Sequence, residues 1–128
     1  MKQHTYEVTL KHIADAQGNP STYADTLSFN SYNHDDIFKV LQMIKNSQIL
    51  DDEAAKSFAV GLKLFSEVML EHKNLPLFKD FMPHFGQFMK AFSVHDKFHR
   101  TLILSGFCLL KIAKISLNSS FFPKPIKR

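Results

Sequence analysis

The sequence predicts an α+β fold in which an N-terminal antiparallel β-hairpin packs on three to four α-helices. Apolar residues alternate with polar ones over the first 30 residues, and they recur every three or four residues from about 35 to 92. The chain has 128 residues, of which 45% are hydrophobic and 13 are phenylalanine. That length and apolar content suit one domain with a single core.

The first strand of the hairpin is predicted where Tyr6, Val8 and Leu10 are separated by polar residues, in a run that continues to Ile13. A period of two is typical of a strand with one buried face. Residues 15–20 are rich in turn-forming types, so a second strand is expected after them. One face of this strand would carry Tyr23, Asp25, Leu27 and Phe29, and the other face would carry Ala24, Thr26 and Ser28. An isolated hairpin is marginally stable in water, so we expect this one to pack on the helices.

The first helix is predicted over residues 35–46. Asn33 or His34 precedes Asp35 and Asp36, and acidic residues in a first turn complement the helix dipole. An anion could bind such a helix start, but two aspartates would repel it, so capping is the favoured role of this segment. The apolar stripe of the helix is Ile37, Phe38, Val40, Leu41 and Ile44.

The second helix is predicted to open at Asp51, Asp52 and Glu53, which we also interpret as a capping cluster. Gly61 within it indicates the close approach of a neighbouring segment. The apolar seam consists of Phe58, Leu62, Phe65, Met69 and His72, widened by Ala55 and Ala59. The polar positions are Lys56, Lys63, Glu67 and Glu71, and we expect them on a solvated face.

A third helical segment is predicted after Asn74, with Pro76 in its first turn. Pro83 lies inside it and lacks an N–H, so we expect a kink, or a short helix followed by a longer one. Phenylalanine and methionine form its stripe: Phe78, Phe81, Met82, Phe85, Phe88, Met89 and Phe92. The stripe is expected to pack in the core, and a groove for a partner is the alternative.

The basic charge is confined to one end of the chain. Residues 1–93 hold nine lysines and no arginine against eleven acidic residues, a net charge of −2. Residues 94–128 hold five lysines and two arginines against one aspartate, a net charge of +6. Nucleic-acid binding needs basic residues clustered on the folded domain, so we expect no nucleic-acid partner.

The chain is predicted to divide into one compact domain, residues 1–93, and a basic and apolar extension, residues 94–128. The apolar run 101–117 approaches the length of a transmembrane helix, but two lysines interrupt its end. Three interpretations stay open for it: a docked helix, a poorly ordered segment, or peripheral association with a membrane.

Several segments resemble a small bacterial family that is catalogued only as a domain of unknown function. They are Lys11–Gly18 (KHIADAQG), Asn33–Phe38 (NHDDIF), Ala59–Leu70 (AVGLKLFSEVML) and Pro76–Phe78. The resemblance covers roughly residues 4–92 and implies a hairpin packed on helices. It implies no activity, because the family has none assigned. Members of the family end soon after the position of Phe92, so residues 94–128 depart from its pattern.

No catalytic, cofactor or metal site is predicted. His95 and His99 share a helix face at a spacing that zinc sites use, with Cys108 as a third candidate ligand, but a Glu after the first histidine is missing. Glu67 and Glu71 could form an acid–base pair, and their polar helix face argues against it. Cys108 lacks a nucleophile motif, and four scattered glycines form no phosphate loop.

The favoured function is therefore a small cytoplasmic module that regulates or binds other proteins without catalysis. No apolar signal segment follows Met1, and the single cysteine, Cys108, fits a reducing compartment. The edges of the hairpin could pair with another strand, so self-association is the specific hypothesis. The alternative is a small-ligand binder or enzyme accessory with a pocket between hairpin and helices, lined by Tyr6, Tyr23 or His12.

Overall fold

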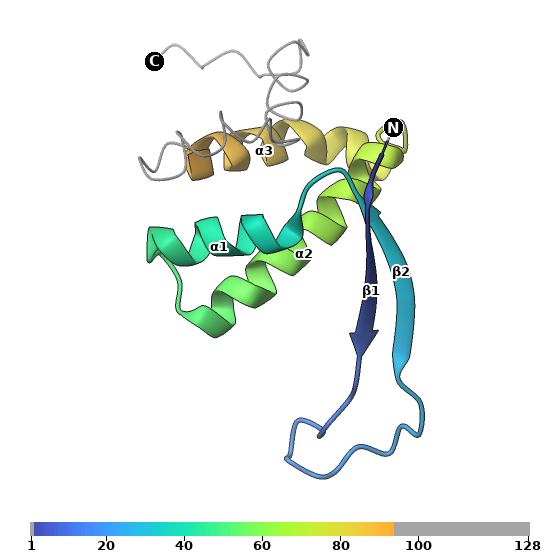
Figure 1. The fold of residues 1–128 in the computed structure, drawn as a ribbon. Coiled ribbons are helices and arrows are strands. Elements are labelled where there is room, and N and C mark those ends of the chain that lie inside the picture. Colours follow the sequence, from blue (N-terminus) through green and yellow to red (C-terminus); the bar gives the residue numbers. More distant parts are fainter. Residues whose placement is uncertain (1, 94–128) are drawn as a thin grey trace, which may run out of the picture. The chain divides into compact units, whose positions relative to one another are not determined.

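The structure is a computed structural model that describes residues 2–93. Two strands come first and three helices follow, which confirms the predicted α+β class. The chain divides after His34 into two compact units, a β-hairpin and a group of helices that begins at Asp35. Figure 1 shows the order of these elements along the chain. The extension 94–128, with its proposed run 101–117, lies outside the described residues.

The hairpin consists of β1, His4–Leu10, and β2, Leu27–Asn33, which pair antiparallel over their whole lengths (Figure 1). His4 lies opposite Asn33 at one end, and Leu10 lies opposite Leu27 at the other. Because side chains alternate between faces, one face is largely apolar and the other is polar. The apolar face carries Tyr6, Val8, Leu10, Leu27 and Phe29.

The strands are shorter at the turn end than the sequence predicts. β1 ends at Leu10, and β2 begins at Leu27 instead of near Tyr23. Between them, an isolated bridge joins Ala14 and Pro20, and a proline cannot donate a ladder hydrogen bond. Local side-chain hydrogen bonds to the backbone replace the ladder here.

The helix α1, Ile37–Ser47, follows β2 after the short connection 34–36. Its N-cap is Asp36, whose side chain accepts from the N–H groups of Phe38 and Lys39 at 3.0 and 3.4 Å. Capping is therefore the role of this segment, but Asp36 performs it, and Asn33 belongs to β2. The C-cap residue, Gln48, adopts a left-handed conformation with φ of 58°.

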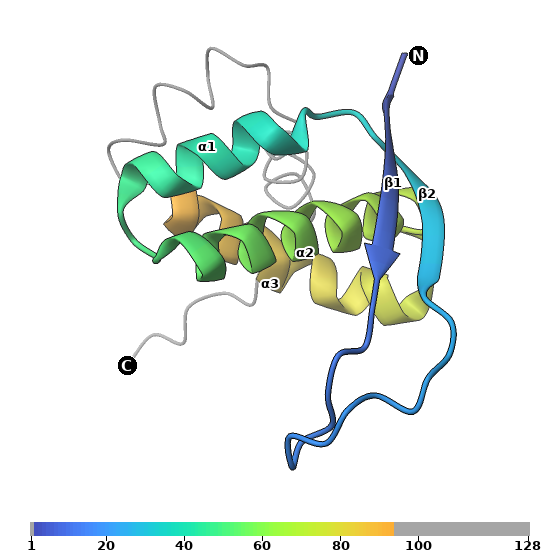
Figure 2. The same cartoon turned by 60° about the horizontal axis from the view of Figure 1, so that its bottom comes forward.

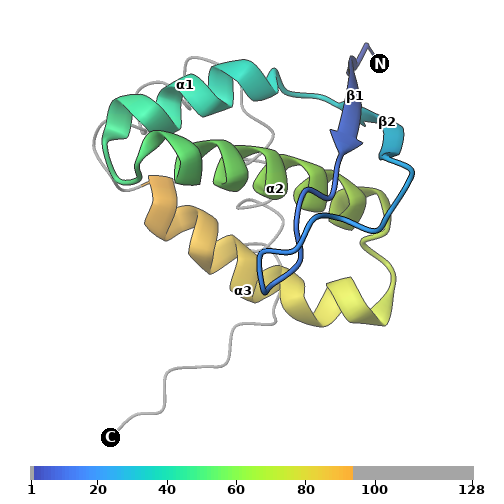
Figure 3. The same ribbon diagram turned by 90° about the horizontal axis from the view of Figure 1, so that it is seen from below.

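The helix α2, Asp52–Glu71, begins as predicted: the side chain of Asp51 accepts from the N–H of Ala54 at 2.8 Å, and Asp52 and Glu53 occupy the first turn. Figures 1 and 3 show α1 and α2 side by side with opposite chain directions. α3, Pro76–Ser93, starts at Pro76 as expected. It continues through Pro83 as one helix, and Figure 3 shows it bending part-way along its length.

The three helices share one core, and Figure 2 shows them grouped. Each helix contributes the apolar residues of one face, as the spacing of three and four predicts. The buried members are Val40 and Ile44, then Ala55, Ala59, Leu62 and Met69, then Met82, Phe85 and Met89. Among residues 2–93, no helix combines the length and the apolar character needed to cross a membrane.

Candidate functional site

The end of the hairpin, residues 11–26, is an ordered loop built around Asp15. One carboxylate oxygen of Asp15 accepts from the backbone N–H groups of Gln17 and Asn19 at 2.9 and 2.8 Å. The other accepts from the side-chain amide of Asn19 at 3.0 Å. These hydrogen bonds, those from Asn19 above all, lower the pKa of Asp15 below its ordinary value of 3.8. Gly18 completes the turn with φ of 90°, which glycine adopts without strain.

A second set of contacts holds the base of the loop together. The Nδ1 of His12 lies 2.7 Å from the hydroxyl of Ser21, and that hydroxyl accepts from the N–H of Tyr23 at 3.1 Å. The rings of His12 and Tyr23 meet edge to face, with centroids 5.1 Å apart. The structure thus brings together two of the three residues named for a ligand pocket, whereas Tyr6 lies in β1.

Large apolar side chains lie exposed around this loop. They are between 44% and 73% exposed, although several belong to the apolar face of the strands. Leu10, Leu27 and Phe29 share one face of the strands, and exposed apolar patches mark interaction sites on proteins. The exposed side chains are Leu10, Ile13, Tyr23, Leu27 and Phe29.

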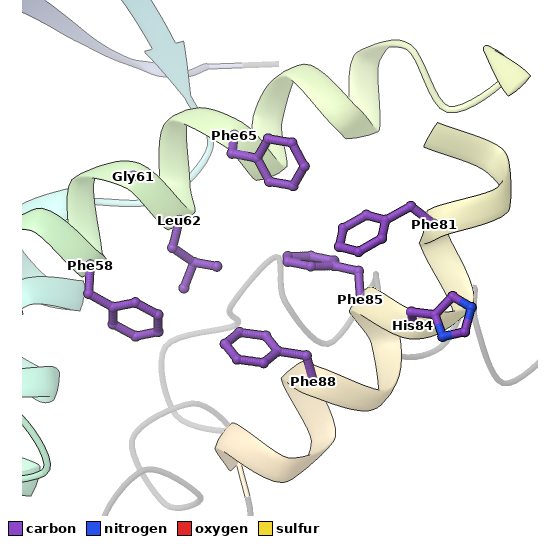
Figure 4. A pocket seen from close by; sticks show the side chains of 8 residues that line it. All are labelled: Phe58, Gly61, Leu62, Phe65, Phe81, His84, Phe85 and Phe88. Atoms are coloured by element: carbon purple, nitrogen blue, oxygen red, sulfur yellow. The ribbon is translucent and has the colours of Figure 1, made fainter. Parts of the chain in front are cut away.

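The helical unit has an open apolar groove of about 470 Å³ between α2 and α3. Figure 4 shows aromatic side chains from both helices along it. The rings of Phe65 and Phe81 lie 6.0 Å apart across the groove, and those of Phe65 and Phe85 lie 6.2 Å apart, all in edge-to-face contacts. The apolar lining consists of Phe58, Leu62, Phe65, Phe81, Phe85 and Phe88.

Two further residues define the chemistry of this groove. Among the described residues of the lining, His84 is the one that is ionisable, and its ring points away from Phe85 in Figure 4. Gly61 lines the groove, and a Cβ placed there would meet no atom within 4 Å. The prediction that Gly61 admits a close neighbour within the fold is therefore wrong for the described residues. A second hollow of about 360 Å³ shares Phe58 and Phe88 with the groove and extends the apolar surface.

Lys63 of α2 forms a buried ion pair, although it was predicted to lie on a solvated face. The Nζ of Lys63 lies 2.5 Å from a carboxylate oxygen of Asp35, and their side chains are 2% and 10% exposed. Glu67 is also buried, while Glu71 is exposed as expected. Lys63 and Glu67 continue the buried stripe of Ala55 and Ala59 at intervals of four residues, so the covered face of α2 is wider than its apolar seam.

The family model of DUF3861, a domain of unknown function for which a structure has been solved, matches residues 4–93. The chain belongs to the DUF3861 family. The predicted resemblance over residues 4–92 is thereby confirmed. No curated protein matches the chain.

A solved structure of unknown function is similar to this DUF3861 member. It is a crystal structure, at 2.20 Å resolution, of a protein from Pectobacterium atrosepticum SCRI1043. The two sequences are 36% identical, with a TM-score of 0.61, and the match covers 72% of this chain and 98% of that one. The neighbour shares the fold of this chain, and both the family and the neighbour are described as of unknown function.

The predicted metal candidates His95, His99 and Cys108 lie outside the described residues. Within residues 2–93, the DUF3861 domain has no group of three or more His, Cys, Asp or Glu residues that could hold a metal ion. The sequence predicted a partner groove only as the alternative to core packing, and only for the stripe from Phe78 to Phe92 on α3. The α2 side of the groove carries a signal of its own, because Gly61 lies between Phe58 and Phe65 at helical spacing.

The loop of the DUF3861 hairpin is expected to depend on the charge of Asp15. Because the pKa of Asp15 is lowered in the fold, its carboxylate stabilises the loop above pH 4, and protonation at lower pH removes that contribution. We expect Asp15→Ala to speed amide hydrogen exchange at Gln17 and Asn19 at neutral pH. Asp25→Ala, at an exposed position of the same loop, is the control. Unchanged exchange in Asp15→Ala, measured by NMR, would show that the carboxylate does not order the loop.

Proposed function

We propose that this DUF3861 domain is a protein-interaction module of the bacterial cytoplasm, and that the hairpin loop with its apolar side chains is the surface that binds the partner. The observation that carries this proposal is the exposure of five large apolar side chains, two in the loop and three in the adjoining strands. An exposed patch that persists on an ordered segment costs stability and solubility unless a partner covers it.

The hydrogen bonds within the loop favour binding because they reduce the conformational entropy that is lost on association. The Asp15 hydrogen bonds and the contact of His12 with Ser21 fix the backbone of the loop before any partner arrives. Less conformational entropy is then lost on association, so a modest contact area supports a useful affinity. Full burial of a large apolar side chain contributes about 1.5–3 kcal/mol.

The strands add a second means of contact. In the described part of the chain the sheet has two strands, so β1 and β2 each have one edge without a neighbouring strand. An extended segment of a partner can pair with such an edge through main-chain hydrogen bonds. Alternate side chains of that segment would then lie on the apolar face beside Phe29 and Leu27.

A protein partner fits the surfaces better than a small molecule does. Small-ligand sites combine an enclosed apolar pocket with a few convergent polar groups that fix orientation. The α2–α3 groove is open, and His84 is the one ionisable group in its lining. The large apolar side chains in and beside the hairpin loop are exposed. A compartment without disulfides suits a chain with the single cysteine Cys108.

We expect Ile13→Glu to abolish partner capture. Ile13 is 69% exposed, so the change places a charge in the binding surface without burying it. The full chain would serve as bait in a bacterial lysate, with quantitative mass spectrometry of the bound proteins. Leu75→Glu, at a position 49% exposed between α2 and α3, is the matched control. A stoichiometric partner that wild type and Leu75→Glu retain, and that Ile13→Glu loses at least tenfold, supports the proposal; equal capture by all three contradicts it.

A further inference from the structure

We propose that the groove between α2 and α3 binds a second copy of this chain, with Gly61 at the contact. This surface belongs to the helical unit and is distinct from the hairpin loop. The inference therefore does not depend on the proposed function.

Two apolar stripes flank the groove. Residues three and four apart on a helix lie on one face, so each stripe forms a continuous ridge. The stripe on α2 is Phe58, Gly61, Phe65 and Val68. The stripe on α3 is Leu77, Phe81, His84 and Phe88. Five large apolar side chains of these stripes are between 41% and 75% exposed: Phe65, Val68, Leu77, Phe81 and Phe88.

Gly61 indicates that something packs closely against this face. Glycine is the least favourable residue in a helix interior apart from proline, so its presence in the middle of α2 needs a reason. Its backbone is helical, so no unusual φ requires glycine. No described atom approaches the position of its missing Cβ within 4 Å, so no packing within the fold requires it either. An external group that enters the groove at Gly61 would account for the glycine, and this is the contact that we infer.

A second copy fits the groove because the face is self-complementary. A two-fold interface uses the same patch on both subunits, so the patch must offer both protrusions and a hollow. Phe65, Phe81 and Phe88 line the groove and are each partly exposed, so they offer apolar surface, and the open space over Gly61 is the hollow (Figure 4). With His84 as the one ionisable residue in the lining, the groove offers almost no charge to a charged partner, and it matches the apolar centre of a homodimer interface.

The available area agrees with this assignment. A phenylalanine side chain buries about 150–250 Å², so three rings that are 41% to 47% exposed offer roughly 250 Å². Val68 and Leu77 raise the apolar area to the order of 400 Å². A standard interface buries about 800 Å² on each partner, and somewhat more than half of that is apolar. The face therefore supplies most of the apolar area that a dimer needs.

The test compares the full wild-type chain with Gly61→Gln by sedimentation equilibrium between about 1 and 200 µM. A glutamine at position 61 fills the hollow with a flexible side chain that meets no atom of its own subunit. Ser57→Gln makes a similar enlargement one helical turn earlier, at an exposed position outside the lining of the groove. We expect a wild-type dimer whose dissociation constant rises at least tenfold in Gly61→Gln and stays within twofold in Ser57→Gln.

Unfolding would not mimic this result, because glutamine favours a helix more than glycine does, so the thermal melt of Gly61→Gln should not fall. A wild-type chain that stays monomeric to 200 µM overturns the proposal, and that is the outcome expected if residues 94–128 of the same chain fill the groove. A dimer that Gly61→Gln does not weaken also overturns it. Ile13→Glu should leave the dimer intact, so failure here and failure of the hairpin surface are distinguishable.

Discussion

Replacing Asp35 with alanine should destabilise the domain by about 3 kcal/mol, because it removes the carboxylate that pairs with the buried ammonium group of Lys63. Lys63 is 1% exposed and has little access to water for compensation. For a domain of about 90 residues, such a loss lowers the melting temperature by roughly 15 °C or more. Thermal and urea unfolding followed by circular dichroism would measure it.

Two further variants test whether the loss of the ion pair causes the destabilisation expected of Asp35→Ala. Asp36→Ala removes the neighbouring carboxylate, which caps α1, and should cost only about 1 kcal/mol. The double change Asp35→Ala with Lys63→Met removes both charges and should recover most of the lost stability. If Asp35→Ala costs no more than Asp36→Ala, the pair contributes little and the prediction is wrong.

Truncating Met69 to alanine should cost about 2–5 kcal/mol, because Met69 is fully buried in the core that α1, α2 and α3 share. The loss combines the removed apolar contacts with the cavity left behind. Met69→Leu keeps the volume and should cost less than about 1.5 kcal/mol.

An exposed position on the same helix gives the reference for Met69. Val60 is 39% exposed, so Val60→Ala should change the free energy of unfolding by less than about 0.5 kcal/mol. Chemical denaturation of the three variants gives the comparison. Equal effects of Met69→Ala and Val60→Ala would place Met69 outside the cooperative core.

Local signals in the sequence predicted the elements of the fold well. The alternation around Tyr6 and Val8, and the spacing of three and four in the helices, follow from the geometry of strands and helices alone. The caps were visible where an aspartate preceded an apolar stripe, as at Asp51. The strand ends at Leu10 and Leu27 were misjudged because the side chain of Asp15 competes with the ladder for backbone hydrogen bonds, and the pattern alone does not show which wins.

Burial of polar residues was the part that the sequence could not predict. Lys63 and Glu67 have the spacing of a solvated face, and only the tertiary structure shows Asp35 next to Lys63, 28 residues away in sequence. The groove was only the alternative prediction, because the phenylalanines that line it were assigned to the core. Packing decides which residues of an apolar stripe remain at the surface, and Phe65, Phe81 and Phe88 do so in part.

The Asp35–Lys63 pair also imposes an order on folding during synthesis. Asp35 leaves the ribosome 28 residues before Lys63, an interval of roughly 1.5–6 s at common elongation rates. A carboxylate is not withdrawn from water before its cation arrives, since an unpaired buried charge is costly. The segment that leads into α1 therefore stays hydrated at Asp35 until more than half of α2 has been translated. A pause in translation between these two codons should lengthen the exposure of the α1 stripe to chaperones, whereas a pause before Asp35 should not.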